Sequence, residues 1–316
     1  MSLEASVRQG FLMGTKEYQP KRSAFVREVP SDGAFELYGD MGTPPWPVQN
    51  AGKQGIGGTD SRTGATAVNT IDEGGQVTSV DGEERGLIVR NVDWEIVIPI
   101  YHNAINDQRT KSLEVWARGA AQSFEKHKDF LAFDALNKGE ATTTYGAGYD
   151  ALAYFSGSHV DPGAEYVTTQ DNQFASALSM DNYETVRVAA SKFKDSRGQP
   201  LGLQHNLLVV ASDLERTGGQ IASNRLEFGT GNNDINIYQG ATRLLVAPGG
   251  WLDTTEWFVI DDSMVAKPLN MQIRQAPELV VWDDEFAGSG GIRYFKWHAR
   301  YAISYGDWRL AAMGNT

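Results

Sequence analysis

The sequence has no cysteine, few basic residues and no long apolar run. Without cysteine the chain can form no disulfide, no thiolate metal site and no cysteine nucleophile, which fits a protein made in a reducing compartment. Its 28 Lys and Arg are outnumbered by 40 Asp and Glu, which gives a formal net charge of −12. A chain of this charge lacks the positive electrostatic potential that phosphate binding requires, so we do not expect it to bind nucleic acid.

The absence of long apolar runs also indicates whether the protein is expected in a membrane or in solution. No stretch approaches the ~20 apolar residues of a membrane span, and the N-terminus has no apolar core of a secretion signal, so we expect a soluble protein. The 316 residues, 41% of them hydrophobic, suffice for one large or two modest domains. No repeat of 20 to 50 residues is visible, which sets solenoids and propellers aside.

Catalytic motifs are absent as well. The chain has neither G-x-x-x-x-G-K-[ST] nor G-x-S-x-G. His159 follows Ser156 and Ser158, but the members of a Ser, His, acid relay must converge from different elements, so we expect a turn residue that bonds to local backbone. A hydrolase that uses His159 stays open as an alternative.

Metal sites are not indicated either. The histidines are dispersed and no two of them stand four apart on a helix. They are His102, His127, His159, His205 and His298. The acidic runs 261–262 and 283–285 match no calcium loop, and we interpret them as solvated turns. We therefore predict no catalytic, cofactor-binding or metal-binding residues.

Residues 39–86 contain no leucine and are crowded with Gly, Thr, Asp, Pro and Ser. Such a segment cannot bury a core of its own. It is either a disordered linker or an extended β-hairpin loop that becomes ordered against neighbouring subunits.

The rest of the chain indicates a mixed α+β fold. Residues 86–100 read as two strands, and 107–136 as a helix about 45 Å long at 1.5 Å per residue. Its apolar stripe comprises Leu113, Trp116, Ala117, Ala120, Phe124, His127 and Leu131. We expect His127 to be a packed residue, because it lies on this stripe.

The second half predicts two shorter helices and several strands. Each helix begins with a capping box, at 181–184 and at 212–215, and an inward stripe follows on the first. Its members are Tyr183, Val186, Ala190 and Phe193. Strand-like runs lie at 207–211, 243–247, 257–260 and 278–282. The aromatic residues of the C-terminal segment indicate sheet core and subunit contact, because base stacking would need a basic groove: Tyr294, Trp297, Tyr301, Tyr305 and Trp308.

A resemblance is strongest in four places, through their order and spacing. They are 149–159, 194–215, the later strands at 244–252, 257–260 and 267–278, and 294–308. From about residue 91 to the C-terminus the chain resembles the Mu-like phage major head subunit (T gene product) family. The resemblance implies the Hong Kong 97-type major capsid fold, with the long helix as its spine helix. Residues 38–47 depart from the family's Arg-Glu-Trp pattern.

The resemblance also implies a division of the chain. The expected parts are an N-terminal arm (1–38), an extended loop (39–86), a peripheral domain (87–148), an axial domain (149–281) and a return to the peripheral domain (282–316), with the last strand as a candidate for the axial domain. The expected assembly-interface residues are Trp46, Lys53, Arg62, Arg85, Trp94, Trp116, Asn232 and Asn233.

The implied function is that of the major capsid protein of a tailed phage or prophage. Copies of the chain would form the pentamers and hexamers of an icosahedral shell that encloses double-stranded DNA without specific binding. Scaffold, maturation protease, portal and decoration proteins are expected partners, and the protein would be assembled in the host cytoplasm and reside in the virion. An encapsulin-like nanocompartment shell, which encloses enzymes, is the second interpretation.

Overall fold

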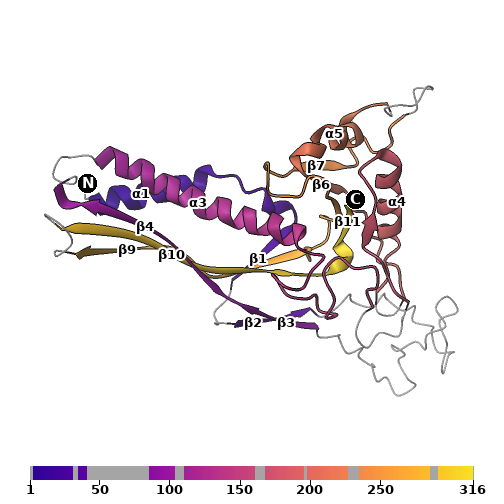
Figure 1. Ribbon diagram of the computed structural model, residues 1–316, viewed down its shortest axis with the longest axis horizontal. Coiled ribbons are helices and arrows are strands. Elements are labelled where there is room, and N and C mark those ends of the chain that lie inside the picture. The colour runs from indigo at the N-terminus through magenta and orange to yellow at the C-terminus, as the bar shows by residue number, and fades with distance from the viewer. Residues whose placement is uncertain are drawn as a thin grey trace, which may run out of the picture.

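The computed structural model describes residues 3–30, 35–40, 85–103, 110–160, 168–195, 198–226, 235–284 and 291–315. The elements form two lobes (Figure 1). An elongated lobe places two helices over a long sheet, and a shorter lobe surrounds a second sheet. One continuous set of buried apolar side chains runs through both lobes. No described helix has the length and apolar character that crossing a bilayer demands.

The long sheet has four strands in the order β1-β9-β10-β4. These are β1 (Val26–Pro30), β4 (Val92–Tyr101), β9 (Leu269–Asp284) and β10 (Ile292–Tyr305). β10 pairs antiparallel with β4 and β9, and β1 pairs parallel with β9.

β9 begins at Leu269, earlier than the sequence predicted. Pro277 argues against a central strand, because proline cannot donate to the ladder. In the structure the register between β9 and β10 shifts from His298–Glu278 to Arg300–Gln275, so Pro277 lies in an irregularity of the pairing. The strand therefore runs through Pro277, whereas the predicted strand began at residue 278.

Two helices cover one face of this sheet (Figure 1). The predicted spine helix is present as α3 (Thr110–Asn137), and its expected start at residue 107 lies outside the described residues. The segment expected to be an N-terminal arm contains a second helix, α1 (Leu3–Glu17), which runs parallel to α3. A Cβ on Gly14 would lie 2.5 Å from the carbonyl oxygen of Arg118, so the two backbones touch at this glycine. The ring of Phe11 stacks on Trp297 of β10 at 5.6 Å, which fixes α1 to the sheet as well.

The predicted stripe on α3 is correct except at one position. Leu113, Ala117, Ala120 and Phe124 are buried, but Trp116 is 55% exposed. Small alanines fill the inward stripe where α1 and the sheet approach closely, and Trp116 lies beside it, on the solvent side.

The shorter lobe contains a five-stranded sheet in the order β5-β11-β8-β6-β7. Its strands are β5 (Gln173–Ala175), β6 (Leu207–Val210), β7 (Arg243–Val246), β8 (Trp257–Ile260) and β11 (Ala311–Asn315). β6 and β8 are wholly buried at its centre. The C-terminal strand β11 belongs to this sheet, whereas β10, which precedes it, belongs to the other.

The helices of this lobe are α4 (Met180–Ser191) and α5 (Glu215–Ser223). The predicted inward stripe on α4 and its continuation is buried throughout. Both predicted capping boxes are wrong. Ser179 caps α4 by accepting a hydrogen bond from the backbone N–H of Asn182 at 3.1 Å, so the helix starts earlier. A 3-10 turn, η2 (Ser212–Leu214), precedes α5, so Ser212 does not occupy the capping position.

The two ends of the expected extended loop are paired with each other. β2 (Phe35–Asp40) and β3 (Arg85–Arg90) form an antiparallel ladder with Asp40 opposite Arg85. Residues 41–84 therefore leave and re-enter the fold at neighbouring positions. Their course lies outside the described residues.

Candidate assembly surface and buried polar centres

The face of the long sheet that lies opposite the two helices carries exposed apolar side chains. On β10 the odd-numbered residues Phe295, Trp297 and Ala299 are buried, so Tyr294 and Lys296 point to the other face. Pairing places further apolar residues beside them on both neighbouring strands. We call this set the outer sheet patch: Val97, Pro99, Val280, Trp282 and Tyr294.

The outer sheet patch is organised as well as exposed. Val280 is 50% exposed and Trp282 is 41% exposed, and the rings of Trp282 and Tyr294 stack at 5.0 Å. Contiguous exposed apolar surface on a folded domain marks a place where another molecule binds. Burying one side chain of this size stabilises a complex by about 1.5–3 kcal/mol before the costs of association.

Charged pairs lie within and beside the patch, since Lys296 is paired with Val97 on one side and with Val280 on the other. Lys296 forms an ion pair with Glu95, and Arg300 pairs with Asp93 at 2.5 Å. Exposed pairs of this kind contribute little to stability. They place fixed charges beside the apolar side chains, and complementary charges on a partner would favour binding in one orientation.

Of the predicted interface residues, the structure describes three. Trp116 is exposed on α3. Trp94 packs internally, because its Nε1 donates to the carbonyl oxygen of Tyr301 at 3.0 Å and its ring lies 4.3 Å from that of His127. Arg85 is at the open end of the β2–β3 ladder. The structure does not bring these three together, and a role in assembly stays a prediction for each.

The remaining predicted interface residues lie outside the described residues. They are Trp46, Lys53, Arg62, Asn232 and Asn233. Of the outer sheet patch, only Tyr294 was among the residues that the sequence indicated for sheet core and subunit contact. A signal for the outward face was present in residues 295–300, where apolar side chains at odd positions alternate with polar ones at even positions.

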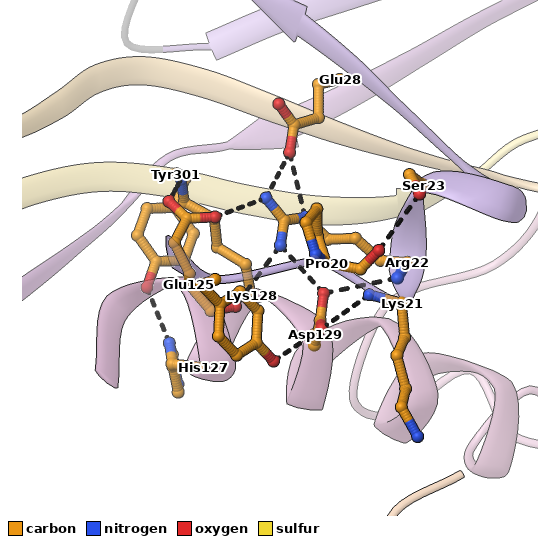
Figure 2. A network of polar contacts seen from close by, with 11 residues as sticks. Pro20, Lys21, Arg22, Ser23, Glu28, Glu125, His127, Lys128, Asp129 and Tyr301 are labelled. Carbon is orange, nitrogen blue, oxygen red and sulfur yellow. Dashed lines mark hydrogen bonds and ion pairs between the residues drawn. The ribbon is translucent and has the colours of Figure 1, made fainter. Parts of the chain in front are cut away.

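A buried polar network joins the N-terminal segment to the spine helix (Figure 2). Arg22 lies in the 3-10 turn η1 (Arg22–Ala24) and is only 3% exposed. Its Nη1 donates to Asp129 Oδ1 at 2.8 Å, and its Nη2 donates to Glu28 Oε1 at 2.6 Å and Glu125 Oε2 at 2.7 Å. Asp129, wholly buried, also accepts a hydrogen bond from the hydroxyl of Tyr18 at 2.8 Å. We call this group the Arg22 network.

The ionisation of the Arg22 network follows from these contacts. Burial alone would lower the pKa of Arg22, but hydrogen bonds to Asp129, Glu125 and Glu28 outweigh it and hold that pKa above its usual value. Burial would likewise raise the pKa of Glu125, but the charge and hydrogen bond of Lys128 help to lower it. The network is therefore a set of satisfied ion pairs at neutral pH, which suits an anchor.

His127 and Tyr301 extend this centre, as Figure 2 shows, with His127 Nδ1 2.7 Å from the Tyr301 hydroxyl. Burial lowers the pKa of His127. The prediction that His127 is a packed residue is confirmed.

His159 is fully buried in the shorter lobe. Its Nδ1 lies 2.5 Å from Asp150 Oδ2, and its Nε2 faces the carbonyl oxygen of Tyr154 at 3.2 Å and Asn172 Oδ1 at 3.1 Å. The ring stacks on Trp308 at 4.3 Å. The prediction that His159 forms a hydrogen bond with nearby backbone is confirmed by its contact with the carbonyl oxygen of Tyr154.

The hydrolase alternative fails on this geometry. A general base needs a free nitrogen beside a nucleophile, but both nitrogens of His159 face other groups. Ser156 and Ser158 instead face each other, with their hydroxyl oxygens 3.3 Å apart.

The acidic runs are only partly the solvated turns that the sequence predicted. Asp261 is fully buried and accepts hydrogen bonds from the backbone N–H of Gln204 at 2.7 Å and from the hydroxyl of Ser263 at 2.5 Å. Burial would raise its pKa, but these hydrogen bonds lower it. Asp283 is exposed and pairs with Arg293. Within the part of the chain that the structure describes, no three His, Asp or Glu side chains gather as metal ligands.

Comparison with known proteins gives this arrangement a context. A model of the family "phage capsid protein" matches residues 91–313. No protein of curated function matches significantly. A subunit of the procapsid of bacteriophage JBD30 is similar with a TM-score of 0.57 and 17% identity, over 99% of this chain and 74% of that chain. For the capsid of an empty GTA particle the TM-score is 0.52 and the identity 11%, over 94% of this chain and 89% of that chain.

The fold is therefore the Hong Kong 97-type α+β fold of capsid shell subunits, as the sequence predicted. Because the family model spans well over half of the sequence, the chain belongs to the phage capsid protein family. It is a structural protein of the phage head rather than an enzyme, and it resides in the virion capsid.

Proposed function

We propose that this protein is the major capsid subunit of a Mu-like phage or prophage. Its copies form pentamers and hexamers of an icosahedral shell that encloses double-stranded DNA. The observation that carries this proposal is the outer sheet patch, because this apolar surface is exposed on the single subunit and another copy of the chain would cover it in a shell. The ordered segments from 149–159 to 294–308 support the assignment to the Mu-like group.

The elongated lobe would be the peripheral domain and the shorter lobe the axial domain. The boundary expected at residue 281 falls inside β9, which is one continuous strand of the long sheet. We therefore place the boundary at residue 268. The axial domain then includes β11, because that strand pairs with β5 and β8.

The loop of residues 39–86 would dock on the outer sheet patch of a neighbouring copy. Its paired ends, β2 and β3, lie on the side of the long sheet away from α1 and α3 (Figure 1). Ordering a loop costs about 1 kcal/mol or more per residue, so one docked loop gives a weak contact. Many such contacts around a closed shell give a strong one. Free subunits then stay soluble until assembly begins.

Other head proteins would act on this assembly. A scaffold, a maturation protease, a portal and decoration proteins are the partners that we propose, with assembly in the host cytoplasm. The shell itself would enclose DNA without gripping it, because the chain carries a formal net charge of −12.

The contents of particles test this proposal against an encapsulin-like compartment. Particles purified from cells that produce phage should contain this chain as the main protein and nuclease-protected double-stranded DNA. Particles that hold an abundant cargo enzyme and no DNA would instead identify a nanocompartment.

A further inference from the structure

One carboxyl group in the shorter lobe is buried without a full set of partners. Glu256 immediately precedes β8, is only 6% exposed, and its Oε2 has no hydrogen-bond partner. A buried carboxylate in this state is costly, because ionised groups require either a counter-ion or hydrogen bonds.

The charged groups that act on Glu256 have the same sign. Among the described residues these are Asp253, in the loop before β8, and Glu140, just beyond the end of α3. Glu140 is itself hydrogen-bonded to two uncharged amides, Gln173 of β5 and Asn315 of β11, which leave its negative charge uncompensated. A third negative charge at this place would therefore be repelled rather than compensated.

The same residues hold the five-stranded sheet on the spine helix. Glu140 Oε1 accepts hydrogen bonds from Gln173 Nε2 and Asn315 Nδ2, both at 2.5 Å, so it links the end of α3 to β5 and β11. The backbone N–H of Asp253 donates to Asn137 Oδ1, on the last residue of α3, at 2.9 Å. These contacts are the connection that repulsion from Glu256 would strain.

We propose that Glu256 is a proton-operated switch that controls how firmly the five-stranded sheet is held on the end of the spine helix. With the proton bound, Glu256 is neutral and the links from Glu140 and Asp253 persist. When the proton leaves, Glu256 becomes a third negative charge that Asp253 and Glu140 repel, and the connection loosens. The switch is a property of the single subunit, so it is tested without assembly.

The direction of the pH dependence follows from the environment of Glu256. Burial, with Asp253 and Glu140, raises its pKa from 4.5 to about 8. The folded protein then holds this proton more tightly than the unfolded chain does. The contribution to stability is fully present below the unfolded pKa of 4.5 and is lost as pH rises toward 8. Within that window the equilibrium constant for unfolding increases by up to about tenfold per pH unit from this group alone.

Glu256→Gln tests the proposal, because glutamine keeps the shape and carries no titratable group. Urea unfolding of the purified chain at pH 5 and pH 8.5, with hydrogen exchange in β11 and at the end of α3, gives both a global and a local measure. From pH 5 to pH 8.5 we expect the equilibrium constant for unfolding to rise at least tenfold more in wild type than in Glu256→Gln. Glu184→Gln, an exposed change on α4, should follow wild type.

A second variant keeps the test decisive if glutamine impairs folding. Asp253→Asn removes one exposed charge that repels the ionised Glu256. Glu256 should then lose its proton at lower pH, so the loss of stability should be complete at a lower pH than in wild type. Parallel pH profiles of wild type, Glu256→Gln and Asp253→Asn would overturn the proposal, as would exchange in β11 that is insensitive to Glu256→Gln at pH 8.5.

Discussion

At the scale of single residues, the polar centres are what tie distant parts of the chain together. Arg22 and Asp129 are 107 positions apart, yet they form one buried ion pair. The Arg22 network fixes the end of the N-terminal segment to α3 and to β1, beyond the point where α1 ends. The N-terminal segment is thus attached twice, by apolar packing of α1 and by this network.

We predict that Arg22→Ala destabilises the subunit by about 3–5 kcal/mol, because it leaves Asp129 and Glu125 without their buried partner. The free energy of urea unfolding measures this. Arg27→Ala, an exposed change on β1, should alter it by less than about 0.5 kcal/mol. Equal effects of the two variants would show that the Arg22 network is not an anchor.

Such polar centres could not be predicted from the sequence, because no local pattern encodes a contact over so many positions. His127 was predicted correctly as a packed residue because it lies on a helical stripe. Asp261 was interpreted as solvated because adjacent acidic residues usually are, whereas the fold buries it with Gln204 and Ser263 as donors.

At the scale of elements, the packing of α1 on α3 depends on a close approach of two backbones. Any side chain at Gly14 would meet the carbonyl oxygen of Arg118 and the Cβ of Ala121. Because both are parts of packed helices, neither can move away cheaply.

We predict that Gly14→Ala destabilises the subunit by about 1–3 kcal/mol through this overpacking. Gly119→Ala is the matched control, since a Cβ on Gly119, also within a helix, meets nothing within 4 Å. That change should be neutral or should stabilise the subunit by about 0.5–1 kcal/mol. Thermal unfolding of both variants decides the matter, and equal melting temperatures would refute the close contact.

The extended loop gives a prediction about assembly rather than stability. Deletion of residues 45–82 should leave the β2–β3 ladder and a folded subunit, because neither β2 nor β3 is removed. The shortened chain should no longer form shells, because it lacks the segment that docks on a neighbour. Circular dichroism checks the fold and electron microscopy checks for particles. Normal particles from the deletion would refute the role of the loop.

Periodicity explains how much of these elements could be predicted. α3 and β6 to β8 were found because their apolar patterns are strong, whereas the first half of β9 was missed, since the predicted strand began only after Pro277. α1 was not predicted, because Gly10 and Gly14 lower the helix propensity of this segment and their contact with α3 is not visible in the sequence.

At the scale of the whole molecule, the outer sheet patch stays uncovered after the described parts of both lobes have packed. We predict that Trp282→Glu, in the outer sheet patch, reduces shell yield at least tenfold and leaves the unfolding free energy within about 1 kcal/mol of wild type. The reason is that Trp282 is partly exposed and faces away from the helices. Val188→Glu replaces an exposed apolar residue of the other lobe as comparison. Sedimentation of particles and urea unfolding give the two readouts.

The fold class was predictable because the order of segments along residues 149–308 matched a known family. The outer sheet patch was not predictable as a whole, because its exposure depends on which face of the long sheet the helices cover. That choice is made by long-range contacts such as Phe11 with Trp297.

A reconstruction by electron cryomicroscopy of particles formed by this chain tests the central claim most directly. We predict a closed shell of many identical copies in which Val280, Trp282 and Tyr294 of each copy are covered by a neighbour. A chain that forms no particles under any assembly condition, or a shell in which this surface faces solvent on every copy, would contradict the account.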